Sequence, residues 1–166
     1  LDQNETAIAE SGSMMMMDDG IQMETIFGDG SAQQPTGFFG KLVSAGKRVL
    51  TGESLFMTAF TNTTGGKRKV SFAAPYTGKI IPMDLQQLGG TIICQKDAFL
   101  CAAKGVSVGL HFQRKLGVGI FGGEGFIMQK LEGDGMAFLH AGGYIVEKEL
   151  KAGEILKIDT GCVVGY

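Results

Sequence analysis

Hydrophobic and polar residues alternate along short segments of this chain, and turns rich in glycine separate the segments. Residues 6–9 and 21–25 show this pattern, and we expect the first of these strands to turn at Glu10-Ser11-Gly12 and return as a hairpin through the methionines 14–17. Asp18-Asp19-Gly20 is typical of a β-hairpin turn, because glycine adopts positive φ without strain. The chain has 27 glycines and 3 prolines among its 166 residues. The pattern therefore predicts many short antiparallel strands and an all-β fold, with one or two short helices.

The order of segments and turns occurs twice. Residues 52–57 read GESLFM and residues 123–128 read GEGFIM, and the intervals 78–85 and 143–150 both run from Gly to Leu over the same number of positions. Agreement at several spacings indicates an internal duplication. We predict one globular unit with three parts: a first repeat at 1–84, a second repeat at 85–149, and the opening hairpin of a third at 150–166.

The first repeat carries an insertion, residues 28–51, that the second lacks. Residues 28–34 are predicted to form a surface loop. Residues 37–50 place Phe39, Val43 and Val49 among bases at helical spacing, which predicts a short amphipathic helix. We favour packing of this helix on the sheet, and peripheral contact of 37–50 with a membrane surface is the alternative.

Composition excludes several classes of protein. Charged residues make up 19% of the chain and the net charge is -2, which argues against a dedicated nucleic-acid binder. No apolar run approaches the roughly 20 residues of a spanning helix, and no signal peptide is visible. The first residue is Leu1, which leaves open whether a targeting segment precedes it. Three cysteines without CxxC spacing are expected to be reduced thiols that act as small apolar residues.

No motif in the chain predicts catalysis, a cofactor or a metal. Residues 117–122 match GxGxxG, but further glycines leave no room for the helix that a dinucleotide site requires. His111 and His140 occupy separate strand patterns without a third ligand, so we expect them to be strand histidines with satisfied hydrogen bonds rather than metal ligands. For the methionines 14–17 we favour flexible packing over thioether ligation of copper. The sequence thus predicts a protein that is not an enzyme.

Two acids occupy equivalent positions in the repeats: Glu53 follows Gly52, and Glu124 lies between Gly123 and Gly125. A carboxylate at such a reversal can accept hydrogen bonds from exposed backbone N–H groups. We expect both acids to be buried and bonded to backbone. A pair of carboxylates for acid–base chemistry is the alternative, but equivalent positions of repeats usually lie far apart.

Five stretches carry a resemblance to a known family, and they read AESGSMMMMDDGIQMET, GESLFMTAFT, AAPYTGKIIPMDL, GIFGGEGFIMQKLEGDG and ILKIDTGCVVGY. In these the chain resembles the altered-inheritance-of-mitochondria (Aim) family over nearly its whole length. The resemblance implies a β-sandwich of the double-stranded β-helix type, whose repeats are similar to the domain of the trp RNA-binding attenuation protein. It also implies bacterial and archaeal cytosolic relatives and a mitochondrial branch linked to inner-membrane organisation. It supplies no catalytic residues.

We therefore expect a non-enzymatic assembly or scaffold protein, and a ligand- or RNA-binding module is the alternative. Because open strand edges invite pairing, we expect a homo-oligomer, with a trimer suggested by the resemblance to a ring of repeats. Nucleic acid is not an expected partner, and no cofactor is expected. The expected location is cytoplasmic for a bacterial or archaeal source and mitochondrial for a eukaryotic one.

Overall fold

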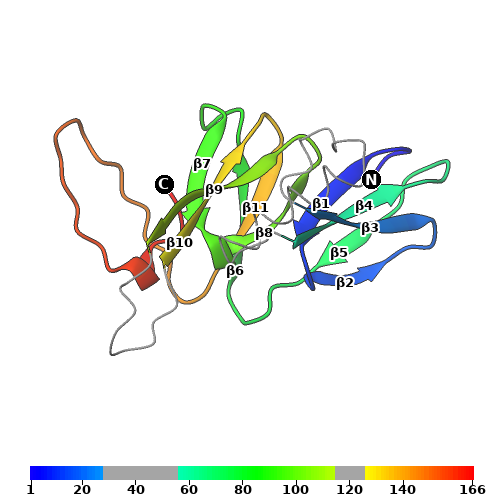
Figure 1. Cartoon of the computed structure of the whole chain (residues 1–166), viewed down its shortest axis with the longest axis horizontal. Helices are drawn as coiled ribbons and strands as arrows, with labels where there is room; N and C mark the ends of the chain where they lie inside the picture. The colour runs from blue at the N-terminus through cyan, green and yellow to red at the C-terminus, as the bar shows by residue number, and fades with distance from the viewer. Residues whose placement is uncertain (28–55, 115–125) are drawn as a thin grey trace, which may run out of the picture.

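The computed structural model describes residues 1–27, 56–114 and 126–166, and the regular secondary structure in these ranges is almost entirely antiparallel strand (Figure 1), which confirms the all-β class. The helical elements in these ranges are two three-residue 3-10 turns, η1 (Lys96–Ala98) and η2 (Thr160–Cys162). The predicted helix 37–50 lies outside the described residues. The strands are β1 (Thr6–Glu10), β2 (Met14–Met17), β3 (Ile21–Phe27), β4 (Phe56–Asn62), β5 (Val70–Phe72), β6 (Lys79–Asp84), β7 (Thr91–Gln95), β8 (Phe99–Ala103), β9 (Ser107–Arg114), β10 (Phe126–Glu132) and β11 (Met136–Ala141).

The strands form three sheets. Six strands make the largest, in the order β3-β4-β1-β8-β11-β6, and the others have the orders β7-β10-β9 and β2-β5. The large sheet joins both predicted repeats, since Ile8 of β1 faces Ala102 of β8 and Pro82 of β6 faces Phe138 of β11. The two smaller sheets each belong to one predicted repeat, β2-β5 to the first and β7-β10-β9 to the second.

The predicted hairpins at the start of the chain are wrong. Asp18-Asp19-Gly20 does form the turn between β2 and β3, and Gly20 has the expected positive φ of 86°. However, β2 pairs with β5 while β3 pairs with β4, so the turn connects two different sheets. The same is true of β1 and β2, because β1 lies in the large sheet.

Alternating residues of the large sheet bury side chains on both of its faces. In β1, Ile8 belongs to one core and Ala9 to the other. The first core lies against the three-stranded sheet and includes Met57, Ile92, Cys94, Phe99, Val108, Leu131 and Leu139. The second core lies against β2 and β5 and includes Ile21, Phe60, Leu100 and Cys101, with Met14, Val70 and Phe72 packed on it. The molecule is thus a β-sandwich with apolar packing on both sides of one central sheet.

The order of strand pairings occurs twice in the chain. β1–β4, β3–β4 and β2–β5 are matched by β7–β10, β9–β10 and β8–β11. A register shift lies between Met14 and Met16 in the first set and opposite the interval from Phe99 to Cys101 in the second. The repeat boundaries 1–84 and 85–149 stay an interpretation of the sequence, and a duplication would produce this pattern of pairing.

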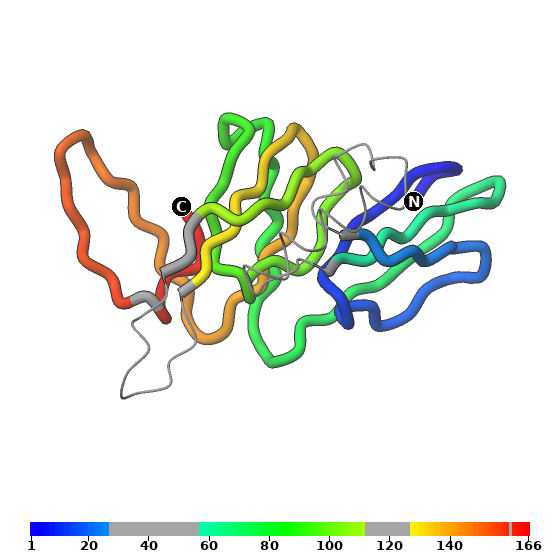
Figure 2. Tube along the Cα trace, in the orientation of Figure 1, coloured from blue at the N-terminus to red at the C-terminus, as the bar shows by residue number. Residues whose placement is uncertain are grey.

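An extended arm, residues 142–159, follows β11 and projects from the body (Figure 2). After the arm the chain returns to β7. The backbone N–H of Ile93 donates to the carbonyl oxygen of Tyr166 at 2.8 Å, and the N–H of Tyr166 donates to that of Ile93 at 2.7 Å. Residues 163–166 thus lie along β7 as β8 lies along β1.

Candidate functional site

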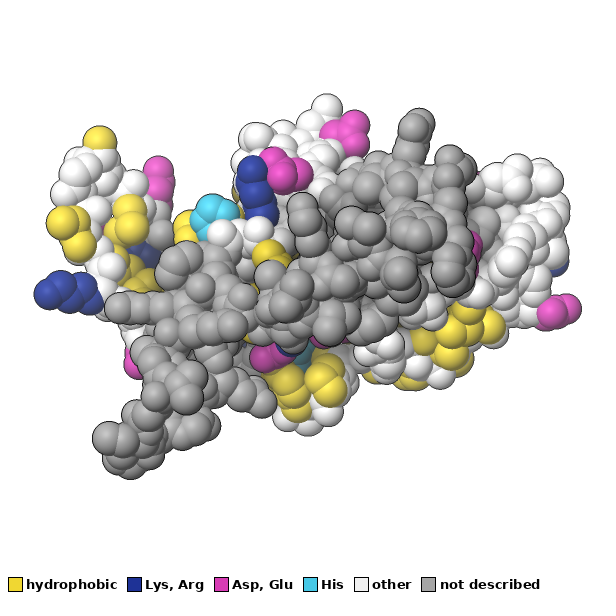
Figure 3. Space-filling view, viewed as in Figure 1, with side chains coloured by type: hydrophobic (Ala, Val, Ile, Leu, Met, Phe, Trp, Pro, Cys, Tyr) yellow, Lys and Arg dark blue, Asp and Glu magenta, His cyan; other side chains and the backbone are white. Residues whose placement is uncertain are grey.

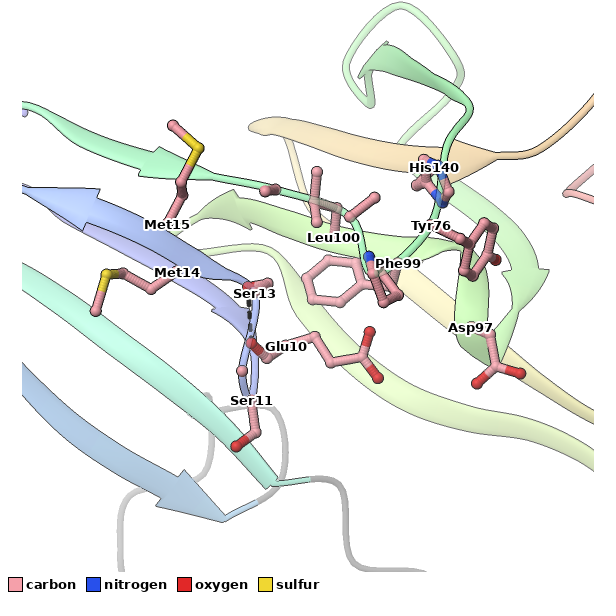
Figure 4. Close-up of a pocket in the computed structure, with 14 residues that line it drawn as sticks. Glu10, Ser11, Ser13, Met14, Met15, Tyr76, Asp97, Phe99, Leu100 and His140 are labelled. Atoms are coloured by element: carbon pink, nitrogen blue, oxygen red, sulfur yellow. Dashed lines mark hydrogen bonds between the residues drawn. The ribbon is translucent and has the colours of Figure 1, made fainter.

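A pocket of about 460 Å³ opens where the turn between β1 and β2, the segment 73–76 and the start of β8 meet (Figure 4). Its walls combine two carboxylates, one histidine and several apolar side chains, including Met14, Phe99 and Leu100. Hollows of this size and mixed lining are typical of small-molecule sites.

The turn between β1 and β2 positions the first carboxylate, Glu10, which is the last residue of β1. Ser13 closes the turn, because its Oγ donates to the carbonyl oxygen of Glu10 at 2.8 Å and its backbone N–H donates to the same oxygen at 3.2 Å. The second carboxylate, Asp97, lies in η1 at the edge of β8. In the view of Figure 4, the side chain of Glu10 extends from β1 toward Asp97.

Burial raises the pKa of the Glu10 carboxyl above its ordinary value of 4.5, and the negative charge of Asp97 raises it further, while Lys96 acts in the opposite direction. Folding thus places an acid where its charged form is disfavoured. A raised carboxyl pKa of this kind is common at functional sites, and burial in a packed structure produces it as well.

His140, on β11, forms the inner wall of the pocket and is only 4% exposed. The Tyr76 ring covers it edge-on, with ring centroids 4.5 Å apart and an interplanar angle of 63°. Gly78 makes the room, because a Cβ there would overlap both His140 Nε2 and the carbonyl oxygen of Ala141. Within the described residues neither ring nitrogen has a hydrogen-bond partner. The expectation of a satisfied histidine is therefore wrong for His140.

Replacing Glu10 with glutamine is expected to raise the melting temperature at about pH 7. The folded state holds the Glu10 proton more tightly than the unfolded chain, so the free energy of unfolding decreases as the pH rises above 4.5. Glutamine removes this dependence, and its advantage should shrink toward about pH 4. Thermal melts at both pH values check the result, with Glu24→Gln on the exposed face of β3 as a control of equal charge change. A lower melting temperature for Glu10→Gln at pH 7 would contradict the assignment.

The repeated Gly-Glu phrases cannot be compared with the pocket. Gly52, Glu53, Gly123, Glu124 and Gly125 lie outside the described residues, as do the GxGxxG stretch 117–122 and the insertion 28–51. The burial predicted for the two acids of these phrases stays a prediction.

Three of the four methionines are not packed as expected, whereas the two histidines lie in separate strands as expected. Met14 packs on the second core, but Met15, Met16 and Met17 are all exposed. The bulge in β2 removes the simple alternation of faces that a regular strand would have. His111 is exposed on β9, on a different strand from His140.

The three cysteines fall into two groups. Cys94 and Cys101 are buried, and burial raises the pKa of each thiol to about 12, which keeps them protonated and unreactive. Cys162 is exposed, so the prediction that all three act as small apolar residues is wrong for this one.

The basic cluster Lys67-Arg68-Lys69 lies beside acids. Lys67 Nζ is 3.5 Å from Asp2 Oδ1, and the backbone N–H of Lys69 donates to Asp18 Oδ2 at 2.8 Å. A surface that binds RNA would instead present unopposed bases together with exposed aromatic rings. The cluster gives no support to the RNA-binding alternative.

Metal-binding clusters and membrane-spanning helices are both absent from the described ranges. No group of three His, Cys, Asp or Glu side chains suited to a metal ion occurs within residues 1–27, 56–114 and 126–166. In the same ranges, no helix has the length and apolar character needed to cross a membrane.

Sequence reasoning missed the pocket because it treated Glu10 as part of a turn. Glu10 pairs with Met57 as Gln95 pairs with Met128, so the two are equivalent residues of the predicted repeats. The carboxylate of Glu10 is thus a difference between the repeats and no part of the pattern that they share, so no motif pointed to it.

Comparison with known proteins supports the assignment of the fold. A family model described as mitochondrial biogenesis AIM24 matches residues 1–166. Seven solved chains match, among them the crystal structure of protein SPYM3_0169 from Streptococcus pyogenes, with a TM-score of 0.59 and 19% identity. That match covers 86% of this chain and 57% of the other, so the chain spans little more than half the length of that protein. No curated protein sequence matches significantly.

Proposed function

The chain belongs to the mitochondrial biogenesis AIM24 family, and we propose that it acts there as a non-enzymatic assembly protein that associates with further copies of itself. The observation that carries the proposal is the difference between β2 and its equivalent β8. Met16 is 61% exposed, while Cys101, at the matching position of β8, is 7% exposed. Both positions follow the bulge of their strand.

The difference has a simple structural origin. β8 lies between β1 and β11, whereas β2 is paired only with β5 in the described part of the chain. β5 likewise has one neighbour there, although its equivalent β11 lies between β8 and β6. Two unpaired strand edges and an exposed apolar face next to them are the surfaces that proteins usually cover by association.

The arm 142–159 is a candidate for the segment that covers them. It follows β11 as β6 follows β5, and its exposed apolar side chains include Tyr144, Val146, Ile155 and Ile158. Figure 3 shows hydrophobic side chains gathered on the arm at the left and over the region of β2 and β5. Because β6 pairs with β11 within the chain, the arm of one copy could pair with β5 of the next in the same way.

Such a contact joins unlike surfaces of two copies, so it continues from copy to copy and forms a ring when the rotation between copies closes. We favour a ring of three, on the resemblance of the repeats to the attenuation protein.

The family description concerns the biogenesis of mitochondria. We extend it to this chain as a role in organising larger complexes, in mitochondria for a eukaryotic source and in the cytoplasm for a bacterial or archaeal one. Contact of residues 37–50 with a membrane is a further proposal that rests on the sequence alone.

Replacing Met16 with lysine is expected to shift the protein from oligomer to monomer. A charge in the covered surface would lose its hydration. This loss weakens association by about 2–4 kcal/mol and raises the dissociation constant by about 30-fold or more. Sedimentation velocity of the full chain at micromolar concentrations measures the shift. Met136→Lys on β11, which exchanges another exposed methionine, is the control and should leave assembly unchanged. A wild-type protein that sediments as a monomer would refute the proposal.

A further inference from the structure

We propose that the pocket beside Glu10 binds an alkylammonium group, with the carboxylates of Glu10 and Asp97 around the cation, His140 as a hydrogen-bond acceptor on the inner wall, and Met14, Phe99 and Leu100 against the aliphatic body of the ligand. This inference does not rest on the proposed self-association, because it concerns a different partner, but the two share β2: Met14 and Met15 line the pocket, and Met16 lies in the surface proposed for assembly.

The charges of the pocket favour a cation. In the part of the chain that the structure describes, the ion pairs are Lys67–Asp2, Lys130–Glu132 and Lys148–Glu154, so neither Glu10 nor Asp97 belongs to one. The two carboxylates act on each other unfavourably, which contributes to the raised pKa of Glu10, and Lys96 compensates only in part. A positive group placed between them would stabilise both charges, whereas an anion would be repelled.

The unpartnered histidine favours a cation that carries N–H donors. His140 is buried to more than nine-tenths, and both of its nitrogens lack a hydrogen-bond partner among the described residues. Buried polar groups are nearly always bonded, so an orphan at the wall of a hollow indicates a missing partner. The acceptor nitrogen of a neutral imidazole can take an N–H from an ammonium ion. A quaternary ammonium ion, which has no N–H, could not make this bond.

The remaining walls favour an aliphatic chain on the cation. Met14, Phe99 and Leu100 come from β2 and β8 and present apolar surface to the hollow. Tyr76 lies opposite, half exposed, and its ring can contact a cation through its π face. A metal ion fits less well, because it would find apolar side chains where it needs ligands, and no three-ligand cluster exists in the described ranges.

Two sources can supply this chemistry: a free amine, or the lysine side chain of a protein. Titration calorimetry of the full chain at constant ionic strength separates them by using n-butylammonium as the first probe and Nα-acetyl-lysine N-methylamide as the second. Saturable binding of n-butylammonium supports the proposal. Tighter binding of the lysine probe identifies a protein side chain as the source, and weaker binding identifies a free amine.

Variants test the assigned residues. Glu10→Gln should weaken n-butylammonium binding about tenfold or more, because a charge-assisted hydrogen bond is lost, while Glu24→Gln on the surface of β3 should leave it unchanged. Asp97→Asn should weaken it less, because Asp97 is exposed and its charge is screened by solvent. The wild-type chain should bind n-butyltrimethylammonium, which keeps the aliphatic chain and the charge, more weakly than n-butylammonium, and the difference reports the contribution of the N–H donors.

Folding does not confound these measurements, because Glu10→Gln is expected to melt at a higher temperature than the wild type. Absence of saturable n-butylammonium binding would overturn the proposal. Equal affinity in Glu10→Gln and the wild type would overturn it as well. Equal affinity for n-butyltrimethylammonium would overturn the role of N–H donors, and with it the role of His140 as an acceptor.

Discussion

Replacing Asn62 with leucine is expected to lower the free energy of unfolding by about 2–4 kcal/mol, since it removes a fully buried amide with four hydrogen bonds. Asn62 Nδ2 donates to the carbonyl oxygens of Leu1 at 3.1 Å and Gly66 at 2.8 Å. Its Oδ1 accepts from the backbone N–H and the hydroxyl of Thr64, at 3.0 and 2.9 Å. One side chain thereby connects the start of the chain to the turn after β4.

Urea denaturation of the variant and the wild type measures the change. Leucine is close to asparagine in size, so the loss should come from the unsatisfied polar groups rather than from a cavity. Gln22→Leu on β3 is the matched control, because its amide is exposed, and it should change stability by less than about 0.5 kcal/mol. A change of similar size in both variants would contradict the role assigned to Asn62.

The strands and turns of this fold could be predicted from the sequence because they depend on neighbouring residues. Alternation marked β1 and β3, and the glycine of Asp18-Asp19-Gly20 marked a real turn with positive φ. The choice of partner strands could not be predicted in the same way. A turn of this chemistry serves equally well between paired strands and between strands of different sheets, so burial of residues far away along the chain decides the pairing.

The candidate pocket could not be predicted from the spacing of residues in the sequence, for a related reason. Its walls come from the turn after β1, the segment 73–76, the start of β8 and the end of β11, which are distant in the chain. No motif links them. The most conspicuous phrases, GESLFM and GEGFIM, reflect the duplication, and their Gly-Glu residues fall outside the described residues. Glu10 differs from its equivalent Gln95, so its carboxylate lies outside the pattern that the repeats share and that the sequence makes visible.

The pocket also depends on the packing of the small sheet on the large one, and Phe60 carries much of that packing. It lies on β4, is 1% exposed, and meets the ring of Phe72 on β5 edge-on, with centroids 5.2 Å apart at 74°. Phe72 is followed directly by the segment 73–76 that forms one wall of the pocket. Leu131, at the equivalent position of the second predicted repeat, is buried as well.

Phe60→Ala is expected to lower the free energy of unfolding by about 3–5 kcal/mol, because a buried ring is lost and the two sheets cannot close the cavity. Phe72→Ala should have a smaller effect, since Phe72 is only partly buried. The double variant should lose about 0.5–1.5 kcal/mol less than the sum of the two, which is the energy expected for an edge-to-face pair. Urea denaturation of all four proteins gives this difference. Strict additivity would show that the rings contribute separately, and that contact between them does not hold β5, or the pocket wall that follows it, against the large sheet.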